Sequence, residues 1–89
     1  MIYTLHIDKE EPGLYAARVL DGRAEVAEFQ AATISGAIRE CAVGTLPGLD
    51  GYNIWYGHVC IGTTSLCAMR HDAETLAQRL VSLHSQFDD

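Results

Sequence analysis

The sequence predicts a single α+β domain spanning residues 1–89, with an antiparallel sheet of four or five strands and two helices in the order βββαββα. Three observations predict this class. Apolar and polar residues alternate along several short segments, and turn-forming residues separate those segments. Two further segments carry apolar residues at helical spacing behind a capping residue. A chain of 89 residues is long enough for one hydrophobic core, and no linker or repeat divides it.

The first third of the chain predicts a three-stranded meander. Residues 2–8 and 14–20 alternate in the manner of half-buried strands. Between them, Pro12-Gly13 stand as in a type II turn, where glycine supplies the positive φ. Asp21-Gly22 predict a tight hairpin turn into a third strand over residues 24–31. That strand is less regular, because its two largest apolar residues fall on opposite faces, which indicates a bulge or a bend.

A first helix is predicted over residues 33–43. Thr33 offers its hydroxyl as a cap, and five apolar residues follow at helical spacing: Ile34, Ala37, Ile38, Cys41 and Ala42. Gly44 stands where such a helix would end. Residues 45–51 contain two turn signals and therefore predict a loop.

The second half predicts two more strands and a second helix. Residues 52–61 are rich in β-forming residues, residues 62–64 indicate a turn, and residues 65–70 indicate a short strand. Asp72 is placed to cap a helix over residues 72–86, whose apolar stripe consists of Leu76, Leu80, Leu83 and Phe87, joined by Val81. We expect both helices to pack on one face of the sheet.

Charge narrows the range of partners. The formal net charge is −6, from twelve acidic and six basic residues, and the acidic excess lies in residues 1–32 and 71–89. Direct nucleic-acid binding requires a clustered Lys/Arg surface, and because this chain has one lysine we do not expect it. The acidic ends keep a small protein soluble, and they would also attract a basic protein partner.

The N-terminal residues and the cysteines predict a cytoplasmic protein. The N-terminus lacks a basic segment followed by an apolar one, and no window approaches the roughly 20 apolar residues of a membrane span. Cys41, Cys60 and Cys67 are odd in number and follow no secreted-protein pattern. We therefore expect three reduced thiols and no disulfide.

The first half resembles the HicB-type antitoxin domain over about residues 2–42. The resemblance lies in Tyr-Thr-Leu-His-Ile-Asp at residues 3–8, Gly-Leu-Tyr-Ala-Ala at residues 13–17, and the capped Thr-Ile-Ser-Gly-Ala-Ile at residues 33–38. Two features depart from that family: its "P-D-L-P-G-C" segment is absent, and Gly36 replaces the usual acidic residue after the cap. The resemblance implies a partner-binding fold that forms dimers or tetramers and takes a small basic toxin as partner. HicB antitoxins commonly append a DNA-binding module, for which no room remains after the last predicted helix, so we expect the partner-binding fold without the DNA-binding role.

One group of residues has the types that bind metal. His58, Cys60, Cys67 and His71 would face one another across a hairpin, and zinc accepts two nitrogens and two sulfurs tetrahedrally. Their spacing, H-x-C-x6-C-x3-H, matches no compact zinc knuckle. The alternative is that both cysteines are small buried apolar residues. On balance we expect no metal and no cofactor.

No catalytic arrangement is recognisable. A nucleophilic Cys–His pair lacks a basic cluster or a third residue that orients it. His6 and Asp8 share one strand face, which is common on solvated surfaces, and phosphate-binding glycine motifs are absent. The protein is therefore expected not to be an enzyme.

Residues 52–61 are the most informative segment for function. Alternation places Tyr52, Ile54 and Tyr56 on one face and Trp55, Val59 and Ile61 on the other, and one layer of helices covers only one face. One explanation is that long loops or the last helix cover the second face. The other, which we prefer, is that Tyr52, Ile54 and Tyr56 form a subunit interface and the protein is a homo-oligomer. The preferred reading is a non-enzymatic interaction domain that self-associates and binds a protein partner. The alternative is a small-molecule or zinc-binding protein that uses the His58/Cys60/Cys67/His71 group.

Overall fold

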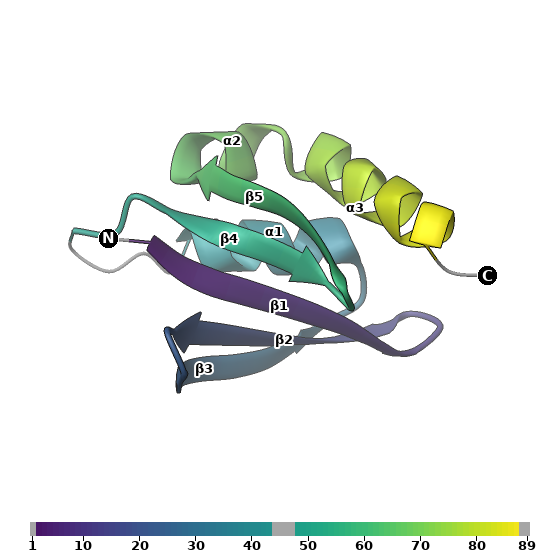
Figure 1. Cartoon of the computed structure of the whole chain (residues 1–89), viewed down its shortest axis with the longest axis horizontal. Helices are drawn as coiled ribbons and strands as arrows, with labels where there is room; N and C mark the ends of the chain where they lie inside the picture. Colours follow the sequence, from purple (N-terminus) through teal and green to yellow (C-terminus); the bar gives the residue numbers. More distant parts are fainter. Residues whose placement is uncertain (1, 44–47, 88–89) are drawn as a thin grey trace.

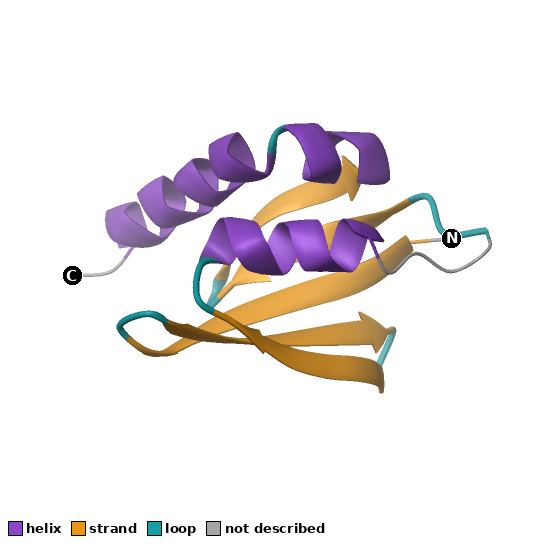
Figure 2. Cartoon of the chain, turned by 180° about the vertical axis from the view of Figure 1, so that it is seen from behind, coloured by secondary structure: helices purple, strands orange, loops and turns teal. Residues whose placement is uncertain are grey.

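A five-stranded sheet with helices on one face forms the described part of the protein, residues 2–43 and 48–87 of a computed structural model (Figures 1 and 2). The strands lie in the spatial order β3-β2-β1-β4-β5. The elements along the chain are β1 (Ile2–Glu11), β2 (Leu14–Asp21), β3 (Ala24–Ala31), α1 (Ile34–Val43), β4 (Gly51–Tyr56), β5 (Val59–Ser65), α2 (Leu66–His71) and α3 (Ala73–Phe87). The α+β class, the succession of three strands, a helix, two strands and a C-terminal helix, and the helices on one face are as the sequence predicts, but α2 is a third helix where two were predicted.

The centre of the sheet differs from the prediction. β1 and β4 run parallel, with Ile2 beside Gly51 and Ile7 beside Tyr56, whereas the three other strand pairs are antiparallel. The prediction of a purely antiparallel sheet was therefore wrong. The reason is the connection through α1, which leaves β3, crosses the helix-covered face of the sheet, and returns on the far side of β1. Such a crossover gives β4 the direction of β3, which is also the direction of β1.

The meander and its turns agree with the sequence. Gly13 and Gly22 have φ angles of +81° and +62°, the conformation that tight turns require and glycine adopts without strain. The register of β2 against β3 shifts between Val19 and Leu20, which leaves Val26 as the extra residue of a bulge. The irregularity predicted for the third strand is thus confirmed.

The first helix also begins where the sequence predicts. The Gly36 backbone N–H donates to Thr33 Oγ1 at 2.9 Å, which satisfies one of the free donors at the start of α1. The five apolar residues of the predicted stripe are all buried. The predicted helix end at Gly44 and residues 45–47 of the predicted loop lie outside the described residues.

The second hairpin turns earlier than predicted. The turn falls at Gly57-His58, so β5 occupies residues 59–65 and includes residues 62–64, where the turn was expected. Residues 66–71 form α2, where a short strand was predicted over residues 65–70. Gly57 has a φ of +60°, the conformation of glycine at the first central position of a type II′ turn. Ser65 then caps α2, accepting a 3.2 Å hydrogen bond from the Ala68 N–H. Short-range alternation placed these boundaries wrongly because residues 62–64 also resemble a turn.

One hydrophobic core lies between the sheet and the helices. Six large side chains are completely buried, three from the sheet and three from the helices: Leu5, Ile7, Ile54, Ile38, Met69 and Leu80. Leu76 is also buried and Leu83 packs against the core, whereas Val81 is half exposed. The Phe87 side chain lies outside the described part of the chain. The stripe predicted for the last helix therefore faces the sheet over its described length.

The helices cover the sheet unevenly. In the view from behind, they lie in front of the strands, yet no helix lies over the outer part of the β2–β3 hairpin (Figure 2). Six of the eight residues of β3 are exposed, whereas β1 alternates between buried and partly exposed residues over its first half. β3 is therefore open along its outer edge and exposed over most of its length, while Phe29 and Ala31 pack partly against the core.

We predict that the protein loses stability at alkaline pH through Tyr52 and Cys41. Burial raises the pKa of the Tyr52 hydroxyl from 10.0, and that of the Cys41 thiol from 9.0, to about 12 in each case. The folded state then holds protons that the unfolded state releases, so the free energy of unfolding falls as pH rises from 9 towards 12.

The test is urea denaturation, followed by circular dichroism, of wild type and Tyr52→Phe between pH 7 and 11. Tyr52→Phe loses a long, 3.5 Å hydrogen bond to the Cys41 carbonyl, so at pH 7 it should cost no more than about 1 kcal/mol. Above pH 10 its stability should decline less steeply than that of wild type. Parallel stability curves would contradict a buried, protonated Tyr52 hydroxyl.

Candidate interaction surface

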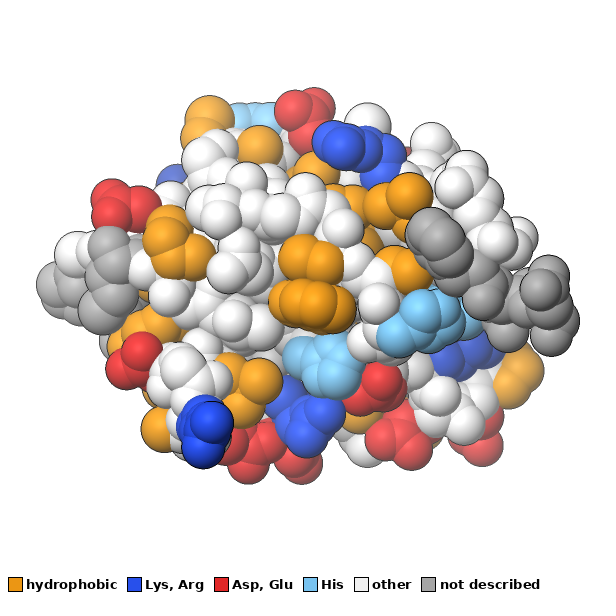
Figure 3. All heavy atoms as spheres, in the orientation of Figure 1, with side chains coloured by type: hydrophobic (Ala, Val, Ile, Leu, Met, Phe, Trp, Pro, Cys, Tyr) orange, Lys and Arg blue, Asp and Glu red, His pale blue; other side chains and the backbone are white. Residues whose placement is uncertain are grey.

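The face of the sheet that points away from the helices is the candidate interaction surface. Side chains of neighbouring strands that are directly paired project to the same face, so the strand register identifies its members. We call this surface the open face; its members on β1, β2, β4 and β5 include Thr4, His6, Asp8, Arg18, Leu20, Asn53, Trp55, Cys60 and Thr63. Figure 3, drawn from this side, shows hydrophobic side chains at the centre of the face with histidine, basic and acidic side chains beside them.

Trp55 is the dominant apolar residue of the open face. Its side chain is 38% exposed, although it lies in β4 near the middle of the sheet. Two shallow hollows adjoin it. One, of about 330 Å³, is lined by Thr4, His6, Leu20 and Gly57, and the other, of about 320 Å³, by His58, Val59, Cys60 and Leu83. The indole is therefore a ridge between two hollows.

The His6 side chain ties the β4–β5 turn to β1. Its Nε2 lies 2.9 Å from the Gly57 carbonyl oxygen, and the Gly57 N–H donates to the Ile7 carbonyl at 2.9 Å. Because a carbonyl only accepts, Nε2 must carry the proton. Arg18 lies 3.0 Å from Nδ1 and only donates, so Nδ1 must be the acceptor. In this arrangement both ring nitrogens of His6 are hydrogen-bonded. These bonds hold the ring in place in the hollow beside Trp55.

Asp8 and Arg18 extend this network without forming a catalytic pair. Asp8 Oδ1 lies 3.8 Å from His6 Nε2, beyond hydrogen-bonding distance, and Nε2 is already bonded to Gly57. Asp8 Oδ2 lies 3.5 Å from the Arg18 guanidinium, and both side chains are more than two-fifths exposed. An ion pair so exposed adds about 0–1 kcal/mol of stability. The network therefore orients polar groups on the open face, and His6 is more constrained than the solvated residue that the sequence predicted.

The predicted interface residues lie on the other face. Tyr52, Ile54 and Tyr56 do share a face, but it is the helix-covered one, and they are 3%, 0% and 8% exposed. The Tyr56 ring packs against His84 of α3, with 4.7 Å between ring centroids. These three side chains belong to the core of the single chain and offer no free surface. Alternation identified the two faces, but only the helix positions show which one is covered.

The partners assigned to Trp55 were also placed wrongly. The turn at residues 57 and 58 restarts the alternation, so Cys60 is the residue paired with Trp55 on the open face. Val59 is instead paired with Tyr56 and is buried, and Ile61 packs against the core. The open face is thus less apolar than predicted, with a single large aromatic side chain.

The four candidate metal ligands are not brought together. His58 lies at the β4–β5 turn and Cys60 just after it, whereas Cys67 and His71 lie in α2, beyond the far end of β5. A strand of seven residues spans roughly 23 Å at about 3.3 Å per residue. Within residues 2–43 and 48–87, no three His, Cys, Asp or Glu side chains are grouped so that they could hold a metal ion. The His58 ring lies instead against His84, 5.1 Å between centroids.

The three cysteines are free thiols in different environments. Cys41 is buried, and burial, followed by the nearby Glu40 charge, raises the pKa of its thiol to about 12. A thiol so rarely ionised is a poor nucleophile. Cys60 is partly buried, with its Sγ accepting the Gly62 N–H at 3.2 Å, and Cys67 is exposed. No arrangement for nucleophilic catalysis follows from these positions.

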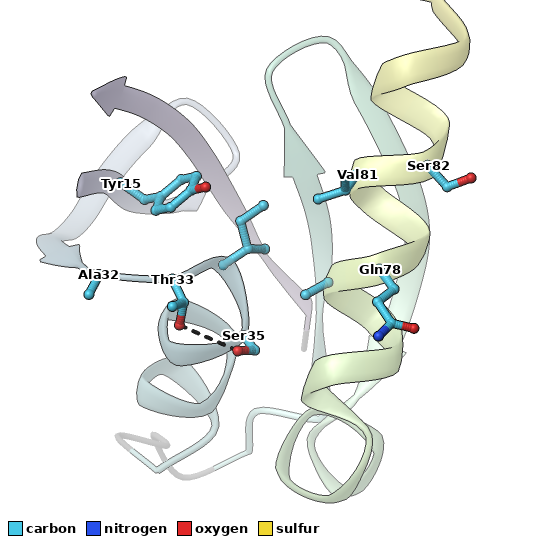
Figure 4. Close-up of a pocket in the computed structure, with 9 residues that line it drawn as sticks. Tyr15, Ala32, Thr33, Ser35, Gln78, Val81 and Ser82 are labelled. Atoms are coloured by element: carbon cyan, nitrogen blue, oxygen red, sulfur yellow. Dashed lines mark hydrogen bonds between the residues drawn. The ribbon is translucent and has the colours of Figure 1, made fainter. Parts of the chain in front are cut away.

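A further hollow, of about 420 Å³, lies between the start of α1 and α3 (Figure 4). Its walls are mainly apolar, and Tyr15, Gln78 and Ser82 lie at its margin. The two hydroxyls at its base, Thr33 and Ser35, lie 3.3 Å apart, and Thr33 already caps α1. These polar groups are explained by the helix start.

Comparisons with known proteins add no relative. No family model matches the sequence, and neither the curated proteins nor the solved structures contain a significant match. The described helices include none that is long and apolar enough to cross a membrane. The resemblance to HicB-type domains therefore rests on residues 3–8, 13–17 and 33–38 alone.

We predict that the three thiols react in the order Cys67, Cys60, Cys41. The exposed Cys67 should be alkylated first and the partly buried Cys60 more slowly, whereas Cys41 should require unfolding because its thiol is buried and protonated. The measurement is timed iodoacetamide labelling at pH 8 with peptide mapping, before and after denaturation. Cys67→Ser should abolish the fast phase alone. Labelling of native Cys41 as fast as Cys67 would contradict the packing described.

Proposed function

We propose that the protein is a non-enzymatic interaction domain that self-associates through the open face, with Trp55 at the centre of the contact. The observation that carries this proposal is a tryptophan, 38% exposed, on a sheet face that none of the described helices covers. Tryptophan and arginine are enriched among residues that dominate interface energies, and the open face presents one of each. The free cysteines fit a reducing compartment such as the cytoplasm.

The shape of the open face suits a twofold contact. In a symmetric dimer the same patch meets itself, so a projection must face a hollow of the partner. Trp55 is such a projection, and the hollow lined by Thr4, His6, Leu20 and Gly57 lies directly beside it. A twofold axis close to Trp55 would place each indole in the other copy's hollow. The ordered His6–Arg18 network keeps that hollow in one shape.

The HicB resemblance supports the same proposal. The hairpin β1–β2, the strand β3 and the capped helix α1 stand in the order from which the resemblance is drawn, and such domains form dimers or tetramers. The alternative, zinc or small-molecule binding by His58, Cys60, Cys67 and His71, has no support from the positions of these residues. A protein partner is part of the proposal as well.

We predict an oligomer that depends on Trp55. Gel filtration with light scattering at tens of micromolar should give at least twice the monomer mass of 9.7 kDa. Trp55→Ser should raise the dissociation constant by about tenfold or more, because an interface tryptophan commonly contributes above roughly 1.4 kcal/mol. The matched control is Val81→Ser, which removes another exposed apolar side chain, 49% exposed, from α3.

Three results decide the proposal. Loss of the oligomer in Trp55→Ser, with retention in Val81→Ser, supports it. A wild-type mass near 9.7 kDa refutes self-association. An oligomer that survives Trp55→Ser and dissociates in Val81→Ser moves the interface to the helix side. Substitution at Tyr56 would not be informative, because this side chain is buried in the core.

A further inference from the structure

β3 is an edge strand with most of its length exposed to solvent. It is the edge strand beside β2, so its outer backbone N–H and C=O groups have no strand partner among the described residues. Both of its faces are also largely exposed, as its burial pattern shows. An uncovered edge is a template for another extended segment, and proteins usually shorten, twist or cover it. At eight residues, β3 is as long as β2, to which it pairs.

An apolar groove runs beneath this edge. It has a volume of about 420 Å³, lies between β3 and α1, and is lined by Tyr3, Val19, Val26, Ala27, Glu28, Phe29, Glu40, Cys41 and Tyr52. Val26, the extra residue of the bulge, is 45% exposed, and Phe29 is only partly buried. A strand added beside β3 would direct every second side chain towards this groove. Apolar residues at those positions would bury surface that β3 leaves in water.

The acidic residues along the β3 edge favour a basic partner segment. The eight residues of β3 include two acids, Glu25 and Glu28, and no base, and Glu40 of α1 borders the groove. The strand register places Glu25 and Glu28 on the open-face side of β3, opposite Leu20 and Arg18. Pairing β3 with β3 of a second copy would bring acids against acids, which is unfavourable. Lys or Arg at alternate positions of an added strand would instead meet opposite charge.

We propose that β3 binds an extended, basic segment of a partner protein as a sixth strand, with Lys or Arg facing Glu25 and Glu28 and apolar residues facing the groove. This is strand addition, in which backbone hydrogen bonds supply affinity and alternate side chains supply specificity. The proposal rests on the proposed role as an interaction domain, but it uses a surface other than the one around Trp55. The contrary view is that the glutamates only protect the edge from pairing.

The test is a titration of the ¹⁵N-labelled protein, followed by NMR, with the acetylated and amidated peptide Lys-Val-Lys-Val-Lys-Val-Lys. Amides of Ala24–Ala31 should show the largest shifts, and their hydrogen exchange should slow, since addition of a strand gives β3 new hydrogen bonds. The control peptide, Glu-Val-Glu-Val-Glu-Val-Glu, has the same alternation and opposite charge. It should bind at least fivefold more weakly.

Matched variants separate local pairing from net charge. Glu25→Gln/Glu28→Gln should weaken binding of the lysine peptide at least fivefold, because two cross-strand ion pairs are lost. Asp72→Asn/Glu74→Gln changes the net charge equally at the start of α3, away from β3, and should alter the affinity less than twofold. All four positions are exposed, so the fold should tolerate the substitutions.

Several outcomes would overturn the proposal. Equal loss of affinity in both double variants would mean attraction by net charge alone, and unchanged exchange in β3 would mean no strand addition. Equal binding of both peptides, or binding of neither, would contradict the selection of a basic segment by Glu25 and Glu28. These results leave the role of Trp55 untouched, because light scattering of Trp55→Ser tests self-association separately. Conversely, if the protein is monomeric and binds the lysine peptide at β3, strand addition is supported and self-association is refuted.

Discussion

The parallel pairing of β1 with β4 is the constraint on which the rest of the structure depends. It joins the two halves of the chain, since every other strand pair links neighbours in sequence. Just after β4, Gly57 is held by its N–H to Ile7 and by its carbonyl to His6. On its other side β4 packs closely on β5, since a Cβ added to Gly51 would collide with the Thr64 carbonyl. The pairing of β1 with β4 sets which residues of β4 face the helices.

The open face around Trp55 and the exposed edge strand β3 both follow from this arrangement. α1 has to cross from β3 to β4, so it lies behind the middle of the sheet and cannot also cover the outer hairpin. α2 and α3 follow β5 and pack on the same side, which leaves the opposite face without a helix among the described residues. β3 is exposed because α1 does not reach the outer hairpin, and Trp55 is exposed because no described helix covers its face. Both are consequences of one layer of helices placed on a wider sheet.

The candidate surface was only partly accessible to sequence reasoning. Alternation correctly indicated that residues 52–56 present two unlike faces, and that one would lack cover. It then assigned Tyr52, Ile54 and Tyr56 to the uncovered side, although they are buried. A period of two separates two faces but contains no information about which one meets the helices. The Gly57-His58 signal was present in the sequence, as glycine before a second turn residue, and reading it would have placed Val59 and Cys60 correctly.

The sequence by itself determined the α+β class, the meander with its two glycine turns, the bulge in β3, the helix α1 with its Thr33 cap, and the helix α3. These features depend on residues within a few positions of one another: the positive φ of glycine, the hydroxyl of Thr33, the spacing of apolar side chains. The tertiary structure alone decided the parallel direction of β4 and the exposure of Trp55. Both depend on the path of the crossover through α1 and on the face that the helices cover, which are settled by packing between segments distant in sequence and leave no local pattern.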